Sequence, residues 1–130
     1  MTRGSQGQLW LGCICLALLG SACQRRLPAG EVQVVSSLRV RQYPQIEARG
    51  IVLLVHGLGS NGKVWNLPGL GGLAGELWRA GFLVYSMEDN LPYPSLTQRA
   101  RDLGTLLTQL SARHPGRPLY GIGHDLGSPV

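Results

Sequence analysis

The chain has 130 residues and a formal net charge of +5, and 15% of its residues are charged. The positive charge comes from 11 arginines and one lysine spread along the sequence without a block of like charge, which favours a solvated surface over a nucleic-acid partner. Its three histidines, His56, His114 and His124, show no metal-ligand spacing with one another or with Cys23, so we expect no metal site and no cofactor.

The first 22 residues are typical of a secretory signal peptide. Arg3 gives a slightly positive start, residues 9–19 form an apolar run of 11 residues, and residues 20–22 are small. The apolar run is too short to span a bilayer comfortably, which makes a transmembrane anchor the weaker interpretation. We therefore expect residues 1–22 to be removed on export.

Cys23 follows the small residues directly, as in the lipobox of bacterial lipoproteins, although Gly20 stands where that motif prefers leucine. Lipidation and plain cleavage both cut before Cys23, so the mature chain begins there in either scheme. We expect a lipoprotein of the bacterial cell envelope, held to the membrane through Cys23, with secretion as the alternative. Cys13 and Cys15 would be lost with the signal, which excludes an intrachain disulfide in the mature form.

Residues 23–30 are interpreted as a polar tether between the membrane end and the domain. After it, residues 31–40 could supply one or two edge strands, although Ser36 and Ser37 interrupt them. From residue 51 onward, apolar strand candidates alternate with helix candidates, which predicts an α/β fold with a doubly wound, mostly parallel sheet. The strands are expected at 51–55, 82–86 and 118–122, and the helices at 70–80 and 95–114.

The longer helix carries clear boundary signals. Ser95 is its expected N-cap, with Gln98 three residues later, and Pro115 and Gly116 end it. An apolar stripe should pack against the core and has no functional role. The stripe consists of Leu96, Ala100, Leu103, Leu107 and Leu110.

The glycine-rich loop at residues 57–64 nearly matches a phosphate-binding P-loop and contains Gly-x-Gly-x-x-Gly. A P-loop needs Ser or Thr after its lysine to bind Mg²⁺, but Val64 stands there. A dinucleotide site needs a helix to open within the glycines, and residues 65–69 would interrupt it. Nucleotide binding is therefore the weaker alternative.

Two short motifs follow two of the expected strands. His-Gly-Leu-Gly occupies residues 56–59, and Gly-His-Asp-Leu-Gly occupies residues 123–127. The second has the form of a nucleophile elbow, in which a strand turns sharply into a helix and holds the nucleophile in strained backbone. Gly123 and Gly127 supply the small neighbours that such a turn needs, and Asp125 stands where serine is usual.

Together the two motifs resemble the first half of the α/β-hydrolase superfamily. The resemblance implies that Asp125 occupies the nucleophile position and that the backbone N–H groups of Leu58 and Leu126 bind the developing oxyanion. It also implies that His56 and Gly57 form the oxyanion loop, with His56 bonding its own loop and not serving as the catalytic base.

The motifs point to different subfamilies. Gly-His-Asp-x-Gly, with His124 before the aspartate, is similar to the elbow of haloalkane dehalogenases and epoxide hydrolases, whose carboxylate attacks carbon and forms an alkyl ester. Those enzymes usually carry proline where this chain has Gly59, which instead resembles esterases and lipases. The expected substrate is accordingly an ester-like or alkyl small molecule. A catalytically altered relative of an esterase is the alternative, because an aspartate in that frame would give a mixed anhydride at best.

Residues 31–130 resemble only the N-terminal part of a hydrolase domain, because the family's triad acid and catalytic histidine come later in chain order. We expect a fragment that lacks both groups and shows no multiple turnover in isolation; a non-catalytic envelope lipoprotein with a vestigial hydrolase fold is the other possibility. The strand at 51–55 should lie between the other two parallel strands, which would bring Leu58 and Asp125 to one edge of the sheet.

Overall fold

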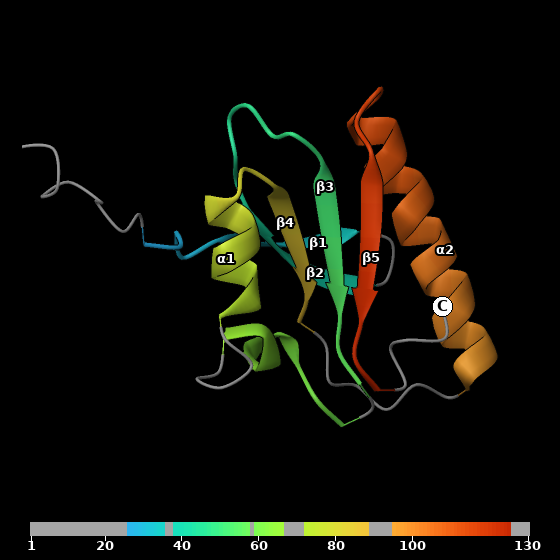
Figure 1. The fold of residues 1–130 in the computed structure, drawn as a ribbon. Helices are drawn as coiled ribbons and strands as arrows, with labels where there is room; N and C mark the ends of the chain where they lie inside the picture. The colour runs from blue at the N-terminus through green and yellow to red at the C-terminus, as the bar shows by residue number, and fades with distance from the viewer. Residues whose placement is uncertain (1–25, 36–37, 58, 67–71, 89–94, 126–130) are drawn as a thin grey trace, which may run out of the picture.

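The computed structural model describes residues 26–35, 38–57, 59–66, 72–88 and 95–125. These residues form one mixed five-stranded sheet with helices on both sides (Figure 1). The elements in chain order are β1 (Glu31–Val35), β2 (Leu38–Tyr43), β3 (Ile51–Val55), the 3₁₀ helix η1 (Gly62–Asn66), α1 (Leu73–Arg79), β4 (Leu83–Met87), α2 (Leu96–Arg113) and β5 (Leu119–Gly123).

The strand order is β1-β2-β4-β3-β5. Strands β4, β3 and β5 are parallel, with Ile51 of β3 paired to Leu83 on one side and to Leu119 on the other. The predicted α/β class is confirmed, and so is the position of β3 between its two parallel neighbours. Residues 31–40 do supply strands. Of the two strands in this region, only β1 is an edge strand, because β2 pairs with both β1 and β4.

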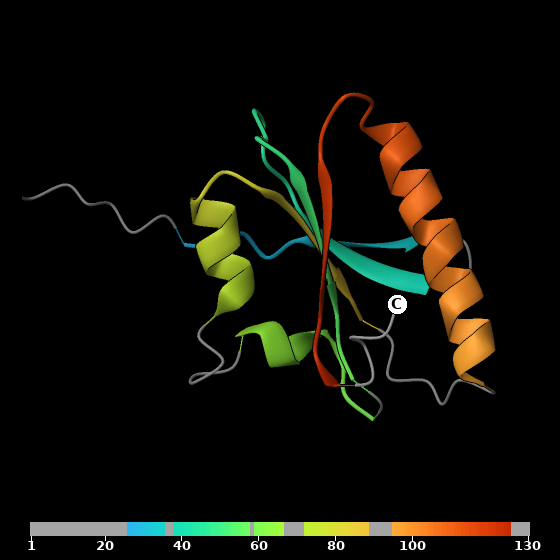
Figure 2. The same ribbon diagram turned by 45° about the vertical axis from the view of Figure 1, so that its right-hand side comes forward.

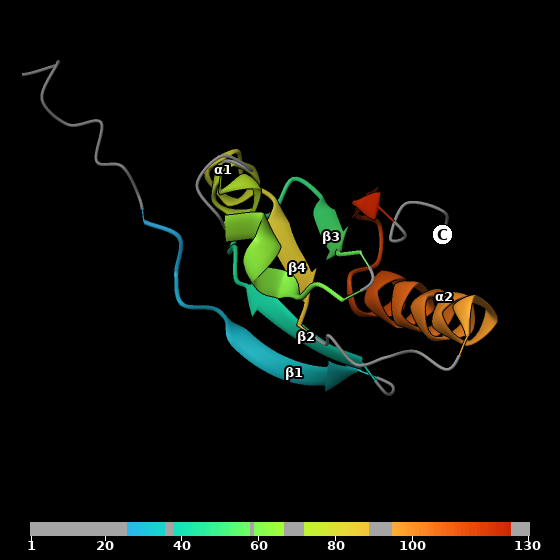
Figure 3. The ribbon, with the colours of Figure 1, turned by 90° about the horizontal axis from the view of Figure 1, so that it is seen from below.

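The two α-helices cover opposite faces of the parallel strands (Figures 2 and 3). The chain passes from β3 to β4 in one direction along the sheet and from β4 across β3 to β5 in the other. Since strand-helix-strand crossovers are right-handed, reversing the direction moves the helix to the other face. Residues such as Leu53 of β3 therefore pack with the leucines of α2, whereas Leu54 packs on the side of Ala74 in α1.

Being covered on both faces explains the continuous apolar character of the central strands. Every residue of β3 and of β4 is buried. Strand β5, which pairs only with β3 among the described strands, is partly exposed along its length, and Tyr120 keeps 50% of its surface accessible. None of the helices in the described part of the chain combines the length and the apolar surface needed to cross a membrane.

Helix α2 begins and ends as predicted, but it presents a different face to the core. Ser95 caps it by accepting a hydrogen bond from the Gln98 N–H at 3.1 Å. Leu96 is 60% exposed and Ala100 is exposed as well, which makes the predicted stripe wrong at these two positions. The buried positions are Arg99, Leu103, Leu106 and Leu110. Both stripes share Leu103 and Leu110 and both fit the helical period, so periodicity alone cannot separate them.

The shorter elements also differ from the prediction. Helix α1 covers Leu73–Arg79 within the expected range 70–80, of which residues 70 and 71 lie outside the described part of the chain. The sequence did not predict η1, whose residue Trp65 is buried against the side of the sheet that α1 covers.

The rotated face of α2 can be tested with a pair of leucines. We expect Leu106→Ala to lower the free energy of unfolding by about 2–5 kcal/mol, because Leu106 is fully buried and its truncation leaves a cavity. Leu96→Ala is the control and should change it by no more than about 0.5 kcal/mol. Urea titration followed by circular dichroism measures both, and a larger loss for Leu96→Ala than for Leu106→Ala would show that the predicted stripe was right.

Candidate functional site

The two sequence motifs meet because β3 and β5 are parallel neighbours that end at the same edge of the sheet. Val55, the last residue of β3, pairs with Gly123, the last residue of β5. Beyond this pair, the His124 N–H donates a hydrogen bond to the Val55 carbonyl at 3.1 Å. Gly57, which follows His56, and Asp125, which follows His124, are therefore brought side by side.

Asp125 has the backbone conformation that an elbow nucleophile requires. Its φ is 54°, and it is the only non-glycine residue with a positive φ in the described part of the chain. Left-handed backbone is unfavourable for side chains with a Cβ, by roughly 1–2 kcal/mol, and aspartate is among the residues that tolerate it best. The Asp125 side chain is exposed at this edge of the sheet. Leu126 and Gly127 lie outside the described residues.

Gly57 lies directly against Asp125. A Cβ added to Gly57 would lie 2.8 Å from Asp125 Oδ2 and 2.9 Å from Asp125 Cβ, too close for any real side chain. Glycine is therefore required at this position for the His-Gly loop to approach the carboxylate. Leu58, whose N–H the resemblance assigns to the oxyanion, lies outside the described residues, so that assignment stays a prediction.

His56 is 2% exposed, and its ring bonds its own loop. Nδ1 lies 2.9 Å from the Gly57 carbonyl oxygen, which can only accept, so Nδ1 carries the hydrogen and donates. Nε2 then has a free lone pair, and it is buried without a hydrogen-bond partner among the described residues. The ring thus holds the turn that carries Gly57 toward Asp125.

Arg99, which the sequence did not single out, holds the same turn from the face of the sheet that α2 covers. Arg99 is 3% exposed, and its guanidinium donates a hydrogen bond from α2 to the His56 carbonyl oxygen. The signal that could have identified it is an arginine on the same helical stripe as Leu103, Leu106 and Leu110, because a cation on a buried face needs acceptors. The carboxyl end of β3 is thus held by α2 on one side and by the start of β5's loop on the other.

His124 is turned toward η1. Its ring meets the buried Trp65 ring edge to face, with centroids 6.2 Å apart and an interplanar angle of 87°. Nε1 of Trp65 is buried and has no hydrogen-bond partner within the described part of the chain. The histidine next to Asp125 is therefore engaged with an aromatic ring.

His114 lies at the opposite end of the parallel strands, where their amino ends are. It is the C-cap of α2, and its Nε2 is 3.0 Å from the Tyr85 hydroxyl. Burial, together with the positive charges of Arg117 and Arg113, lowers the pKa of His114. Among the described residues, no histidine hydrogen-bonds the Asp125 carboxylate, and no group of three His, Cys, Asp or Glu side chains could hold a metal ion.

The glycine loop has packing that disfavours the nucleotide alternative. A Cβ on Gly62 would lie 2.5 Å from Glu88 Oε1 and 2.6 Å from the Met87 carbonyl oxygen. The loop thus packs closely against the Glu88 carboxylate. Oε1 of that carboxylate pairs with Arg41 Nε at 3.2 Å. A carboxylate at this distance opposes binding of a phosphate by the same backbone.

The contact between the two motifs can be tested with two glycine substitutions. We expect Gly57→Ala to lower the free energy of unfolding by about 1–3 kcal/mol, because its methyl group overlaps Asp125. Gly104→Ala is the control: it lies in α2 with open space around it, and the change should stabilise the chain by about 0.5–1 kcal/mol. Urea titration measures both, and a neutral Gly57→Ala would contradict the close approach.

Comparisons with known proteins agree with this fold. No family model matches the sequence, and no curated protein is detectably similar to it. Among solved structures, the fold is similar to that of a soluble variant of monoglyceride lipase from Saccharomyces cerevisiae, with 20% identity, a TM-score of 0.50 and coverage of 80% of this chain. It is also similar to a predicted CIB-like hydrolase from Thermoplasma acidophilum, with 19% identity, a TM-score of 0.51 and coverage of 75% of this chain.

The chain spans 37% of the length of the lipase and 51% of the length of the second hydrolase. At these identities the likeness concerns the fold alone. The mostly parallel sheet, the helices on both faces and the strand order of the described residues are therefore those of part of an α/β-hydrolase fold.

Proposed function

We propose that this chain is part of a hydrolase that acts on an ester-like or alkyl small molecule through a nucleophile at Asp125. The observation that carries the proposal is the left-handed backbone of Asp125, at the point where the end of β5 meets Gly57. Strained backbone of this kind persists only where the surroundings enforce it, and it is common at active sites. The fold likeness to a lipase and to a hydrolase supports the same reaction class.

An aspartate nucleophile favours attack on an alkyl carbon. A carboxylate oxygen of Asp125 forms a bond to the carbon, the bond to the leaving group breaks, and the leaving group takes the electron pair. In an epoxide the leaving group is the ring oxygen, which then takes a proton from water. The product of this step is an alkyl ester on Asp125.

Cleavage of that ester needs a second step, in which a base activates water. His124 faces Trp65 and His114 lies at the opposite edge, so neither is placed to serve Asp125. The described residues therefore support formation of the alkyl ester but not its hydrolysis. In the hydrolase family, the groups that carry out this second step come later in chain order than the nucleophile.

A trapping experiment tests this division. When the 130-residue chain is incubated with a reactive epoxide, we expect its intact mass to rise by one epoxide molecule, with no diol released by the protein. Peptide mapping should place the adduct on Asp125. Asp125→Asn is the matched control, because asparagine keeps the shape and tolerates left-handed backbone but lacks the nucleophilic oxygen.

Two results would change the proposal. Sustained turnover that disappears in Asp125→Asn would show that a base is present after all. An unaltered mass, together with no release of product from a chromogenic short-chain ester, would favour the second candidate, a non-catalytic envelope lipoprotein with a vestigial hydrolase fold. The aspartate in an otherwise esterase-like frame, with Gly59 in the oxyanion loop, is the observation that favours this candidate.

We further propose that the protein is exported and held to the membrane by lipid on Cys23, which lies outside the described residues. The apolar run at 9–19 and the small residues before Cys23 support this proposal. Its partners would then be the membrane and a small-molecule substrate.

Mass spectrometry of the protein from its native envelope tests the export scheme. We expect Cys23 as the first residue, carrying diacylglycerol, because lipidation of Cys23 and removal of residues 1–22 belong to one processing scheme. Cys23→Ser should move the protein out of the membrane fraction. An unmodified Cys23 at the N-terminus would indicate secretion, and a chain that retains residues 9–19 would contradict both schemes.

A further inference from the structure

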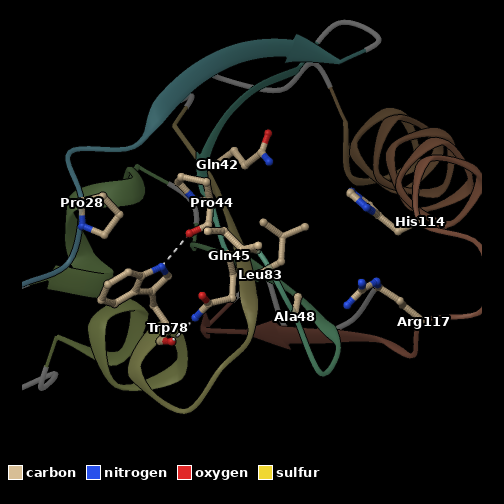
Figure 4. A pocket seen from close by; sticks show the side chains of 10 residues that line it. Pro28, Gln42, Pro44, Gln45, Ala48, Trp78, Leu83, His114 and Arg117 are labelled. Atoms are coloured by element: carbon tan, nitrogen blue, oxygen red, sulfur yellow. Dashed lines mark hydrogen bonds between the residues drawn. The ribbon is translucent and has the colours of Figure 1, made fainter. Parts of the chain in front are cut away.

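A hollow lies at the amino ends of the parallel strands, away from Asp125 (Figure 4). Its volume is about 580 Å³, within the range of small-molecule sites. It lies between the end of α1, which contributes Trp78, and the end of α2, which contributes His114. Leu83, the first residue of β4, lies between them, so the hollow belongs to the edge opposite the candidate catalytic site.

One side of the hollow is apolar and held in place. Trp78, Pro44 and Leu83 line it. The Trp78 indole Nε1–H donates to the Pro44 carbonyl at 2.8 Å, and the Gln45 amide donates to the Trp78 carbonyl at 2.9 Å. These two bonds fix the indole against the loop between β2 and β3, so the apolar wall exists before any ligand binds.

The other side is cationic. Arg117 and His114 line it together, and Figure 4 shows both on the side away from Trp78. None of the described residues that line the hollow is an aspartate or a glutamate. A guanidinium beside an apolar wall, without a carboxylate in the same hollow, is complementary to a ligand that combines an anionic head with an apolar body.

Tyr85 holds one of the two ring nitrogens of His114. The Tyr85 hydroxyl lies 3.0 Å from His114 Nε2, within hydrogen-bond distance. Because Nε2 is engaged there, Nδ1 is the ring nitrogen that remains for a ligand. Burial and the positive charges of Arg117 and Arg113 lower the pKa of His114.

We propose that this hollow is a binding site for an amphipathic organic carboxylate. The carboxylate accepts hydrogen bonds from the Arg117 guanidinium, beside His114, and the alkyl or aryl body lies on Trp78 and Leu83. The site is separated from Asp125 by the length of the parallel strands, so its occupation does not depend on the proposed hydrolase activity.

The test compares two probes of equal chain length and opposite charge. Octanoate and octyltrimethylammonium are titrated into the ¹⁵N-labelled 130-residue chain, and ¹H–¹⁵N spectra are recorded. We expect octanoate to bind with a dissociation constant on the order of 1 mM and to shift the signals of Trp78 and His114. The cation should shift neither. Arg117→Gln should weaken octanoate binding roughly tenfold, because it removes a charge-assisted hydrogen bond.

Arg101→Gln is the matched control, since it removes the same charge from an exposed position of α2 and should leave the affinity for octanoate unchanged. The spectra of both variants without ligand report whether each retains the fold. The proposal is overturned if the ammonium probe binds as well as octanoate, if Arg117→Gln and Arg101→Gln bind octanoate equally, or if the shifted signals lie away from this edge of the sheet.

Discussion

The parallel pairing of β3 with β4 and β5 is the constraint on which the rest of this structure depends. Strand β3 is buried on both faces and lies between its two parallel neighbours. The loops before and after it therefore lie at the two ends of the parallel strands. At its carboxyl end, backbone and side-chain hydrogen bonds come from both sides: His124 N–H donates to the Val55 carbonyl, and Arg99 donates to the next carbonyl along, that of His56. The candidate site therefore lies at the end of a fully buried strand whose last turn is hydrogen-bonded from two sides.

The same pairing separates two kinds of chemistry. Parallel strands collect their following loops at one edge and their preceding loops at the other. The carboxyl edge carries Asp125 in strained backbone against Gly57. The amino edge carries an apolar hollow with Arg117 at one side. Between the two sites lie β3 and β4, whose residues are buried along the whole length of both strands.

Positioning Asp125 and Arg99 at the carboxyl ends of the parallel strands costs free energy of folding. The left-handed conformation of Asp125 costs roughly 1–2 kcal/mol in general, and burying a guanidinium such as that of Arg99 costs several kcal/mol before its hydrogen bonds are counted. Neither the left-handed backbone of Asp125 nor the buried guanidinium of Arg99 adds to the apolar core. Both help to bring the His-Gly loop and Asp125 together. Such an arrangement is expected where a site has been selected for its geometry at some expense of stability.

Local sequence determined the strands, their parallel order and the position of the tight turn at Asp125, because these depend on short-range properties: apolar runs, alternation of strand and helix signals, and the glycine before His124. Tertiary structure decided the buried face of α2, since two stripes share Leu103 and Leu110 and only the sheet distinguishes them. It also decided the role of Arg99 and the hollow beside Trp78. These features join segments far apart in the chain, and the pattern within one segment does not show which other segment its residues will contact.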